Sequence, residues 1–198
     1  MYEAMQDPYC YVGTGVLKNR WHIRKQSDLA EAEAMLAQQR IAELYLNSSV
    51  TGRFGLPHLK KIHKFMFQDI YSWAGKIRTV RISKGQSMFA YPEYIVPEAN
   101  HLFKQLQEEN CLSGLSKGNF VARSAWYIGE LNTLHPFREG NGRALRVFMW
   151  LLGRRAGWEI QFENVDSNEW LNACIASYGG NYRPMEEVLT PIVAGLEF

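Results

Sequence analysis

The sequence predicts a mainly α-helical protein that forms a single domain over residues 1–198. A chain of 198 residues is the size of one domain with a substantial core. Apolar residues recur every three or four positions along most of the chain, which is typical of amphipathic helices. Only residues 76–91 change to the two-residue period of strands. We therefore expect about six to eight helices around a central buried pair, with one small β-hairpin.

The N-terminal third is expected to hold an irregular extension and a first helix. Turn formers and aromatic residues dominate residues 1–26, which predicts irregular structure. A helix then begins at Ser27 or Asp28, and Gly52 lies beyond its end. Its expected inward positions are Ala30, Ala34, Ala37, Ile41 and Leu44.

A second helix begins near Pro57, since proline suits the first helical turn, and Gly75 is expected to stop it. The hairpin of residues 76–91 follows, with its turn at residues 84–87. Further helices are expected after Pro97, Asn119, the glycines at 140–142, Asp166 and Pro184. The segment 119–134 is apolar nearly all round, so the helix-loop-helix of residues 119–156 should lie at the centre.

Composition excludes several classes of protein. The net charge is +2, which is too balanced to indicate direct nucleic-acid binding. The longest apolar run, Val147–Leu152, is too short to span a membrane, and the N-terminus lacks the pattern of a secretory signal. Three cysteines without paired spacing favour reduced thiols. We expect a cytoplasmic bacterial protein, or one in a host cytosol if the chain belongs to a secreted effector.

The chemistry-bearing residues gather in the loop that reads HPFREGNGRALR, residues 135–146. Pro136 disfavours helical backbone in the residue before it, so the central helix should end near Leu134. His135 would then lie just beyond the C-terminal end of that helix. Gly140 and Gly142 permit positive φ around Asn141, so successive N–H groups can turn inward. With the start of the next helix they would form an anion site.

Four side chains add to this cradle. His135 can accept a proton near pH 7, and Glu139 is a hard oxygen ligand of the kind Mg²⁺ prefers. Arg143 and Arg146 share one helical face and match phosphate oxygens. A solvated basic helix face would explain the arginines alone, but the joint pattern is that of phosphoryl or nucleotidyl transfer. The loop is not a Walker A motif.

Residues His135–Arg146 match the motif HxFx[DE]GNGRxxR of the Fic domain family, and the opening segment Asp7–Ile23 resembles its short, toxin-like bacterial branch. Thr51–Arg78 is similar to the segment before the family's hairpin, and Ile82–Ala90 is similar to its flap. The resemblance implies a Fic fold and transfer of AMP from ATP, with Mg²⁺, to a Tyr, Thr or Ser hydroxyl of a target protein. It also implies the roles of the motif residues: His135 as base, Glu139 as Mg²⁺ ligand, Gly140, Asn141 and Gly142 as phosphate cradle, and Arg143 and Arg146 as phosphate clamp.

The same resemblance extends the site beyond the loop. Lys84 and Gly85 on the flap and Asn132 on the central helix would border the nucleotide, and Trp170 would stack on the adenine unless it is a core residue. The flap would hold an extended target segment, as an unpaired strand edge can. Its docking residues are expected to be Ile82, Lys84, Phe89 and Ala90.

The resemblance also bears on regulation. Many members of the family are inhibited by a helix with the motif [ST]xxxE[GN], whose glutamate pairs with the second motif arginine, here Arg146. Ser27–Glu31 has the spacing, but Ala32 follows it and an ordinary helix start explains it. We therefore expect a small antitoxin to supply the glutamate in trans; a glutamate of this chain on Arg146 would contradict that. Family analogy points to a type II topoisomerase as target.

Two other functions remain open. The same fold could transfer phosphate, UMP or phosphocholine, although Gly142 and Arg146 disfavour phosphate transfer. The domain could also bind nucleotide without turnover, as an interaction module.

Overall fold

The computed structural model describes residues 7–47, 50–85 and 87–196. These residues form seven α-helices and two pairs of short strands, none of the helices being long and apolar enough to cross a membrane. The helices are α1 (Gln26–Asn47), α2 (Leu56–Phe67), α3 (Pro92–Glu108), α4 (Lys117–Leu134), α5 (Asn141–Ala156), α6 (Ser167–Tyr178) and α7 (Arg183–Ile192). The strands are β1 (Ser83–Lys84), β2 (Ser87–Met88), β3 (Trp158–Ile160) and β4 (Val193–Gly195), and 3-10 turns cover Asn110–Leu112 and Phe162–Asn164.

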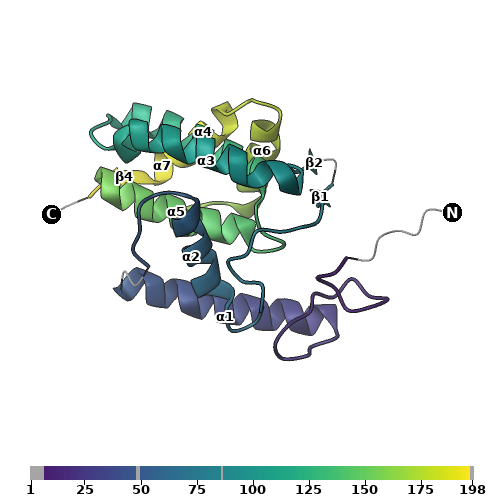
Figure 1. Ribbon diagram of the computed structural model, residues 1–198. Coiled ribbons are helices and arrows are strands. Elements are labelled where there is room, and N and C mark those ends of the chain that lie inside the picture. The colour runs from purple at the N-terminus through teal and green to yellow at the C-terminus, as the bar shows by residue number, and fades with distance from the viewer. Residues whose placement is uncertain (1–6, 48–49, 86, 197–198) are drawn as a thin grey trace.

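Helix α4 lies at the centre of the arrangement. It packs against α3, α5, α6 and α7, while α5 also contacts α2 and β3. Figure 1 shows α1 along one side, α2 between α1 and α5, and the β1–β2 hairpin near the start of α3. The predicted mainly helical fold with a central buried helix pair is confirmed.

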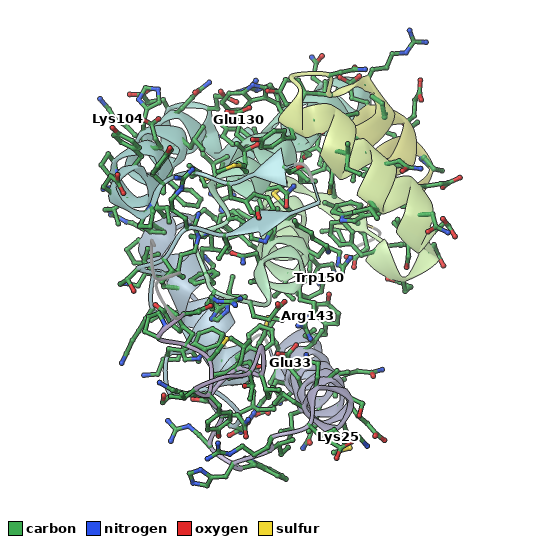
Figure 2. The ribbon with its side chains drawn as sticks, turned by 90° about the vertical axis from the view of Figure 1, so that its right-hand side faces the viewer. Lys25, Glu33, Lys104, Glu130, Arg143 and Trp150 are labelled. Carbon is green, nitrogen blue, oxygen red and sulfur yellow. The ribbon has the colours of Figure 1, made fainter. Side chains whose placement is uncertain are left out.

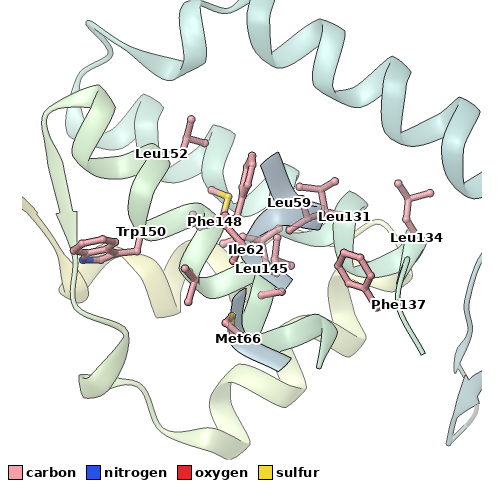
Figure 3. Close-up of a cluster of buried hydrophobic side chains, with 14 of the residues drawn as sticks. Leu59, Ile62, Met66, Leu131, Leu134, Phe137, Leu145, Phe148, Trp150 and Leu152 are labelled. Atoms are coloured by element: carbon pink, nitrogen blue, oxygen red, sulfur yellow. The ribbon is translucent and has the colours of Figure 1, made fainter. Parts of the chain in front are cut away.

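The core forms where α2, α4 and α5 meet. Leu131 of α4, Ile62 of α2 and Phe148 of α5 are each at most 3% exposed, and Figure 3 shows them in one cluster. Burying side chains of this size contributes about 1.5–3 kcal/mol each. Phe137, from the loop between α4 and α5, joins the same cluster. The loop of residues 135–146 is therefore anchored in the core by its own aromatic residue.

The strands differ from the expectation in two ways. Within residues 76–91, only two residues on each side pair as strand, with Ser83 opposite Met88; Gln86 lies outside the described residues. A second antiparallel pair, β3–β4, was missed by the sequence analysis. Its strands have three residues each, which is too short to show a strand period.

The helix bounds also differ in places. Helix α2 ends at Phe67, before the expected stop at Gly75, and α3 begins at Pro92 and includes Pro97. On α1, Ala30 and Ala34 are exposed, whereas Glu33 is buried beside Leu29 and Ala37. The buried face of α1 is rotated because Glu33 has partners on neighbouring elements, which hydrophobic spacing does not reveal.

Candidate active site

The turn that carries His135 has the predicted form. Helix α4 ends at Leu134, and His135 caps it in the left-handed conformation, with φ of 46°. Proline at 136 explains why the helix stops there. Positive φ is uncommon outside glycine, so the surroundings hold this residue in place.

The imidazole of His135 has one ring nitrogen bonded and the other available. Its Nδ1 lies 3.1 Å from the carbonyl oxygen of Asn132, so Nδ1 carries the proton and donates it. Nε2 has no hydrogen-bond partner among the described residues and is not fully buried. The ring stacks on Phe89 with centroids 3.7 Å apart. Burial, with smaller effects of the Arg78 and Lys84 charges, lowers the pKa of His135 to about 4, which keeps Nε2 free to accept a proton at pH 7.

The loop after His135 is closed by Asn141. Its Oδ1 accepts the backbone N–H of Phe137 and its Nδ2 donates to the carbonyl of Phe137, both at 2.8 Å. Asn141 is buried and is the first residue of α5. Its side chain therefore shapes the loop, and its contribution to the expected phosphate cradle can come only from its backbone.

The N-terminus of α5 presents an uncapped helix end. Gly140 precedes it with φ of 78°, and no side chain caps it. The first backbone bond of the helix runs from the Ala144 N–H to Gly140 O, so the N–H groups of the three residues between have no partner within the helix. Unpaired N–H groups and the helix dipole favour an anion at this end.

Glu139 is the carboxylate of the loop, and its side chain is 48% exposed. One oxygen accepts the Gly140 N–H at 2.8 Å and lies 3.8 Å from Arg143 Nη2. No group of three His, Cys, Asp or Glu residues that could hold a metal occurs in the described part of the chain. A single accessible carboxylate fits Mg²⁺ only if phosphate oxygens and water complete its ligand shell.

The five arginines near the loop divide into paired and unpaired side chains. Three pair with carboxylates and one with a hydroxyl: Arg138 with Asp7, Arg143 with Glu33, Arg154 with Glu159, and Arg155 with Ser113. Arg146 has neither an ion pair nor a hydrogen bond within the described residues, and burial lowers its pKa. Its guanidinium lies 5.8 Å from the ring of Trp170. Arg146 is thus a half-buried cation to which no described residue supplies a counter-charge.

Arg143 has different surroundings. Its Nη2 pairs with Glu33 of α1, whose other oxygen accepts the Tyr71 hydroxyl, and Figure 2 shows Glu33 and Arg143 next to each other. The guanidinium also lies 4.8 Å from the ring centre of Phe67. The sequence analysis gave Glu33 and Tyr71 no role.

The predicted residues of the hairpin lie either at its exposed tip or at its buried base. Lys84 and Gly85 are exposed at its tip, where Gly85 has φ of 59°. Phe89 and Ala90 lie at its base: Phe89 is 8% exposed against His135, and the Ala90 N–H donates to Thr133 O of α4. The Phe89 N–H donates to Ile82 O at 3.3 Å. Trp170 is 8% exposed and lies edge-on to Phe162.

Two supporting residues were also missed. His63 of α2 bonds the Glu139 carbonyl through Nε2 at 2.9 Å, and Arg78 donates to the His135 carbonyl through Nε at 2.7 Å. Both belong to the segment Thr51–Arg78. Lysines lie close to both in the sequence, so no local signal marked either residue as buried.

Comparison with known proteins agrees with the loop geometry. The model of the Fic/DOC family matches residues 53–152, which include the whole loop. The chain belongs to the Fic/DOC family. Among curated relatives, it is 46% identical over 180 residues to the protein adenylyltransferase VbhT of Bartonella schoenbuchensis, covering 91% of this chain but 37% of that protein. It is 40% identical to the probable protein adenylyltransferase y4lH of Sinorhizobium fredii, covering 93% of this chain and 94% of that one.

Solved structures of Fic proteins share the whole architecture. The BepC protein of Bartonella tribocorum with bound AMPPNP superimposes with a TM-score of 0.89 at 29% identity, covering 98% of this chain and 100% of that one. The N-terminal Fic domain of a Bep effector protein from Bartonella quintana, with bound ADP, has a TM-score of 0.88 at 29% identity, covering 96% and 95%.

Proposed function

We propose that this Fic protein is a protein adenylyltransferase, which transfers AMP from ATP to a Tyr, Thr or Ser hydroxyl of a target protein. The observation that carries the proposal is Arg146, a half-buried guanidinium with no counter-charge among the described residues. It lies near the uncapped N-terminus of α5, on the same loop-helix unit as the neutral base His135. Relatives at 37–46% identity bear the name protein adenylyltransferase, and two structural neighbours hold nucleotides.

The residues divide the reaction between them. Nε2 of His135 takes the proton from the target hydroxyl, whose oxygen attacks the α-phosphorus. The new O–P bond forms as the bond to the β-phosphate oxygen breaks, and pyrophosphate leaves. Backbone N–H groups at the start of α5 bind the phosphates, and Arg146 neutralises their charge. Arg143 would add to this clamp with the donors that Glu33 leaves free.

Glu139 would hold the Mg²⁺ ion, which supplies charge neutralisation to the phosphates when bound. Lys84 and Gly85 at the hairpin tip would border the nucleotide, and Trp170, close to Arg146, would contact the adenine. The open edge of the hairpin would hold the target segment.

Arg146 also supports the proposed regulation. None of the ion pairs in the described part of the chain involves it, so no glutamate of these residues pairs with Arg146. A small antitoxin that supplies a glutamate to Arg146 would block the site in trans. We place the protein in the cytoplasm and, by family analogy, a type II topoisomerase among its targets.

Labelled ATP tests the activity. The protein is incubated with Mg²⁺, a bacterial lysate and ATP labelled on either the α- or the γ-phosphate. Adenylylation deposits only the α label, and mass spectrometry of the labelled band should find one AMP on a hydroxyl side chain. Label from the γ-phosphate alone would indicate phosphate transfer instead.

Two histidine variants identify the base. His135→Ala should abolish labelling and leave ATP binding within about twofold, because the imidazole acts on the hydroxyl proton. The matched control is His101→Ala on the exposed surface of α3, which should label like the wild type. Binding of ATP with no transfer by the wild type would favour the interaction module.

A further inference from the structure

Arg78 is a buried cation that pairs with no carboxylate of the described residues. Arg78 is 1% exposed, and no ion pair among the described residues includes it. Burial lowers its pKa to about 10. Burying a charge is costly unless hydrogen bonds satisfy it, so the contacts of this side chain must be extensive.

Arg78 binds three consecutive carbonyl groups of the His135 turn. Nη2 donates to Leu134 O at 3.2 Å, Nε donates to His135 O at 2.7 Å, and the backbone N–H donates to Pro136 O at 2.9 Å. These carbonyls lie at and just after the end of α4, where the helix leaves acceptors unpaired and carries partial negative charge. They therefore replace the carboxylate that a buried arginine needs.

The same guanidinium also binds both ends of the hairpin segment. Nη1 donates to Val80 O at 2.7 Å, on the way into β1, and Nη2 donates to Ala90 O at 2.5 Å, on the way out of β2. One planar group thus joins the chain before the hairpin, the chain after it and the turn of the base.

The contacts of Arg78 affect the position of His135. That residue is held in a left-handed conformation, and its ring lies against Phe89. Phe89 directly precedes Ala90, so Arg78 fixes both the backbone of the base and the residue next to its stacking partner. A shift at either contact would move Nε2. Misplacement of a reacting group by about 1 Å can cost about 10²-fold in rate.

We propose that Arg78 is a positioning residue that holds the hairpin base and the His135 turn as one rigid unit, so that a target held on the hairpin meets the base in a fixed geometry. The inference rests on the proposed function of His135 and adds to it a residue outside the motif.

Arg78→Lys tests the proposal, because lysine keeps the charge but cannot reach separated carbonyls with a planar fork. The rate of AMP transfer to the labelled lysate band, at saturating ATP, should fall about 10²-fold. Affinity for AMPPNP, measured by calorimetry, should stay within about twofold. The control Arg81→Lys changes an exposed arginine of the same segment and should keep the wild-type rate. An unchanged rate in Arg78→Lys, or equal losses of rate and affinity, would overturn the proposal.

Hydrogen exchange on the wild-type protein gives a second test that needs neither activity nor a folded variant. The amide of Arg78, bound to Pro136 O, and the amide of Ala90, bound to Thr133 O, should exchange as slowly as the amides of α4. Exchange of these two amides faster than those of α4 would contradict a rigid unit. If the wild type labels no acceptor, the proposed function fails, while this measurement still decides whether the hairpin base and the His135 turn form one rigid unit.

Discussion

Arg143 and Arg146 lie about one turn apart on α5 and carry the same charge, but their surroundings are opposite. Arg143 is tied to Glu33 of α1 and lies over Phe67 of α2. Arg146 faces Trp170 of α6 and has no partner of opposite charge among the described residues. The first arginine completes a contact between helices, whereas the second completes none within this part of the chain.

The difference shows that one motif can serve two physical purposes. The α1–α2 side of α5 is fastened by a half-buried ion pair, so Arg143 stabilises the fold that carries the loop. On the α6 side, no described residue compensates the charge of Arg146, and an anionic ligand would do so. Substitutions on the two sides should therefore separate loss of stability from loss of binding.

Glu33→Gln should have the largest effect. It removes the charge that compensates Arg143 while the side chain can still accept the Tyr71 hydroxyl, and the Glu33 side chain is only 11% exposed. Removing one partner of a fully buried ion pair typically costs about 3–5 kcal/mol. Because the Arg143 side chain is 26% exposed and Glu139 also lies near it, we expect urea unfolding to show a loss at the lower end, about 3 kcal/mol. Glu31→Gln, on the exposed face of α1, is the control. Equal losses in both variants would contradict a stabilising role of the pair.

Gly140→Ala should follow. A Cβ at this position would meet the Phe67 ring at 2.4 Å, and φ of 78° is strained for alanine. Overpacking and left-handed strain together predict a loss of about 3 kcal/mol in the free energy of unfolding. Gly114→Ala has similar strain, with φ of 81°, but open space around it, so it should lose only about 1 kcal/mol. Equal losses in Gly140→Ala and Gly114→Ala would show that the Phe67 ring can move aside, and that the loop packs less tightly against α2.

Arg146→Gln addresses the other side of the comparison. Loss of a charged hydrogen bond to phosphate predicts a fall of about 10- to 100-fold in ATP affinity by calorimetry. The free energy of unfolding should not fall, because no partner in the described structure is lost. Arg154→Gln at the far end of α5 breaks a surface pair and should leave ATP affinity unchanged. Lower stability with normal affinity would reverse the roles of the two arginines.

Features that depend on neighbouring residues in the chain were predictable from the sequence. The end of α4 at Leu134 follows from Pro136, and the start of α6 follows from Asp166, whose side chain accepts two backbone N–H groups. The family motif likewise lies within twelve consecutive residues, and the family itself is confirmed. The roles assigned to individual motif residues stay predictions.

Supports that depend on tertiary contact were not predictable. Glu33 is separated from Arg143 by 110 residues, and Arg78 from His135 by 57, so no spacing rule connects them. On α1, hydrophobic spacing favoured Ala30 and Ala34 as inward residues because it has no means to recognise a buried glutamate with a distant partner. Such pairings are decided by packing of the helices.

The smallest expected effect concerns His63, which supports the loop on the α2 side. Its Nδ1 accepts the Gly75 N–H at 2.8 Å, so its Nε2 carries the proton and donates to Glu139 O at 2.9 Å. The ring stacks on Phe137, and burial lowers its pKa to about 4. Protonation would force a proton onto Nδ1 and break the bond to Gly75.

The pH dependence follows from the direction of this shift. The unfolded chain binds a proton at His63 below its ordinary pKa of about 6.5, but the folded protein binds it only below about 4. Stability from this group is therefore complete above pH 6.5 and is lost as the pH falls towards 4. Between pH 6.5 and 5.5 the loss is about 1 kcal/mol. His63→Gln keeps a donor for Glu139 O but does not titrate, so its unfolding free energy should fall less over this interval, whereas exposed His101→Gln should follow the wild type. If His63→Gln and the wild type gave parallel curves, His63 would be protonated in the folded state, and the α2 side of the loop would be looser than its contacts imply.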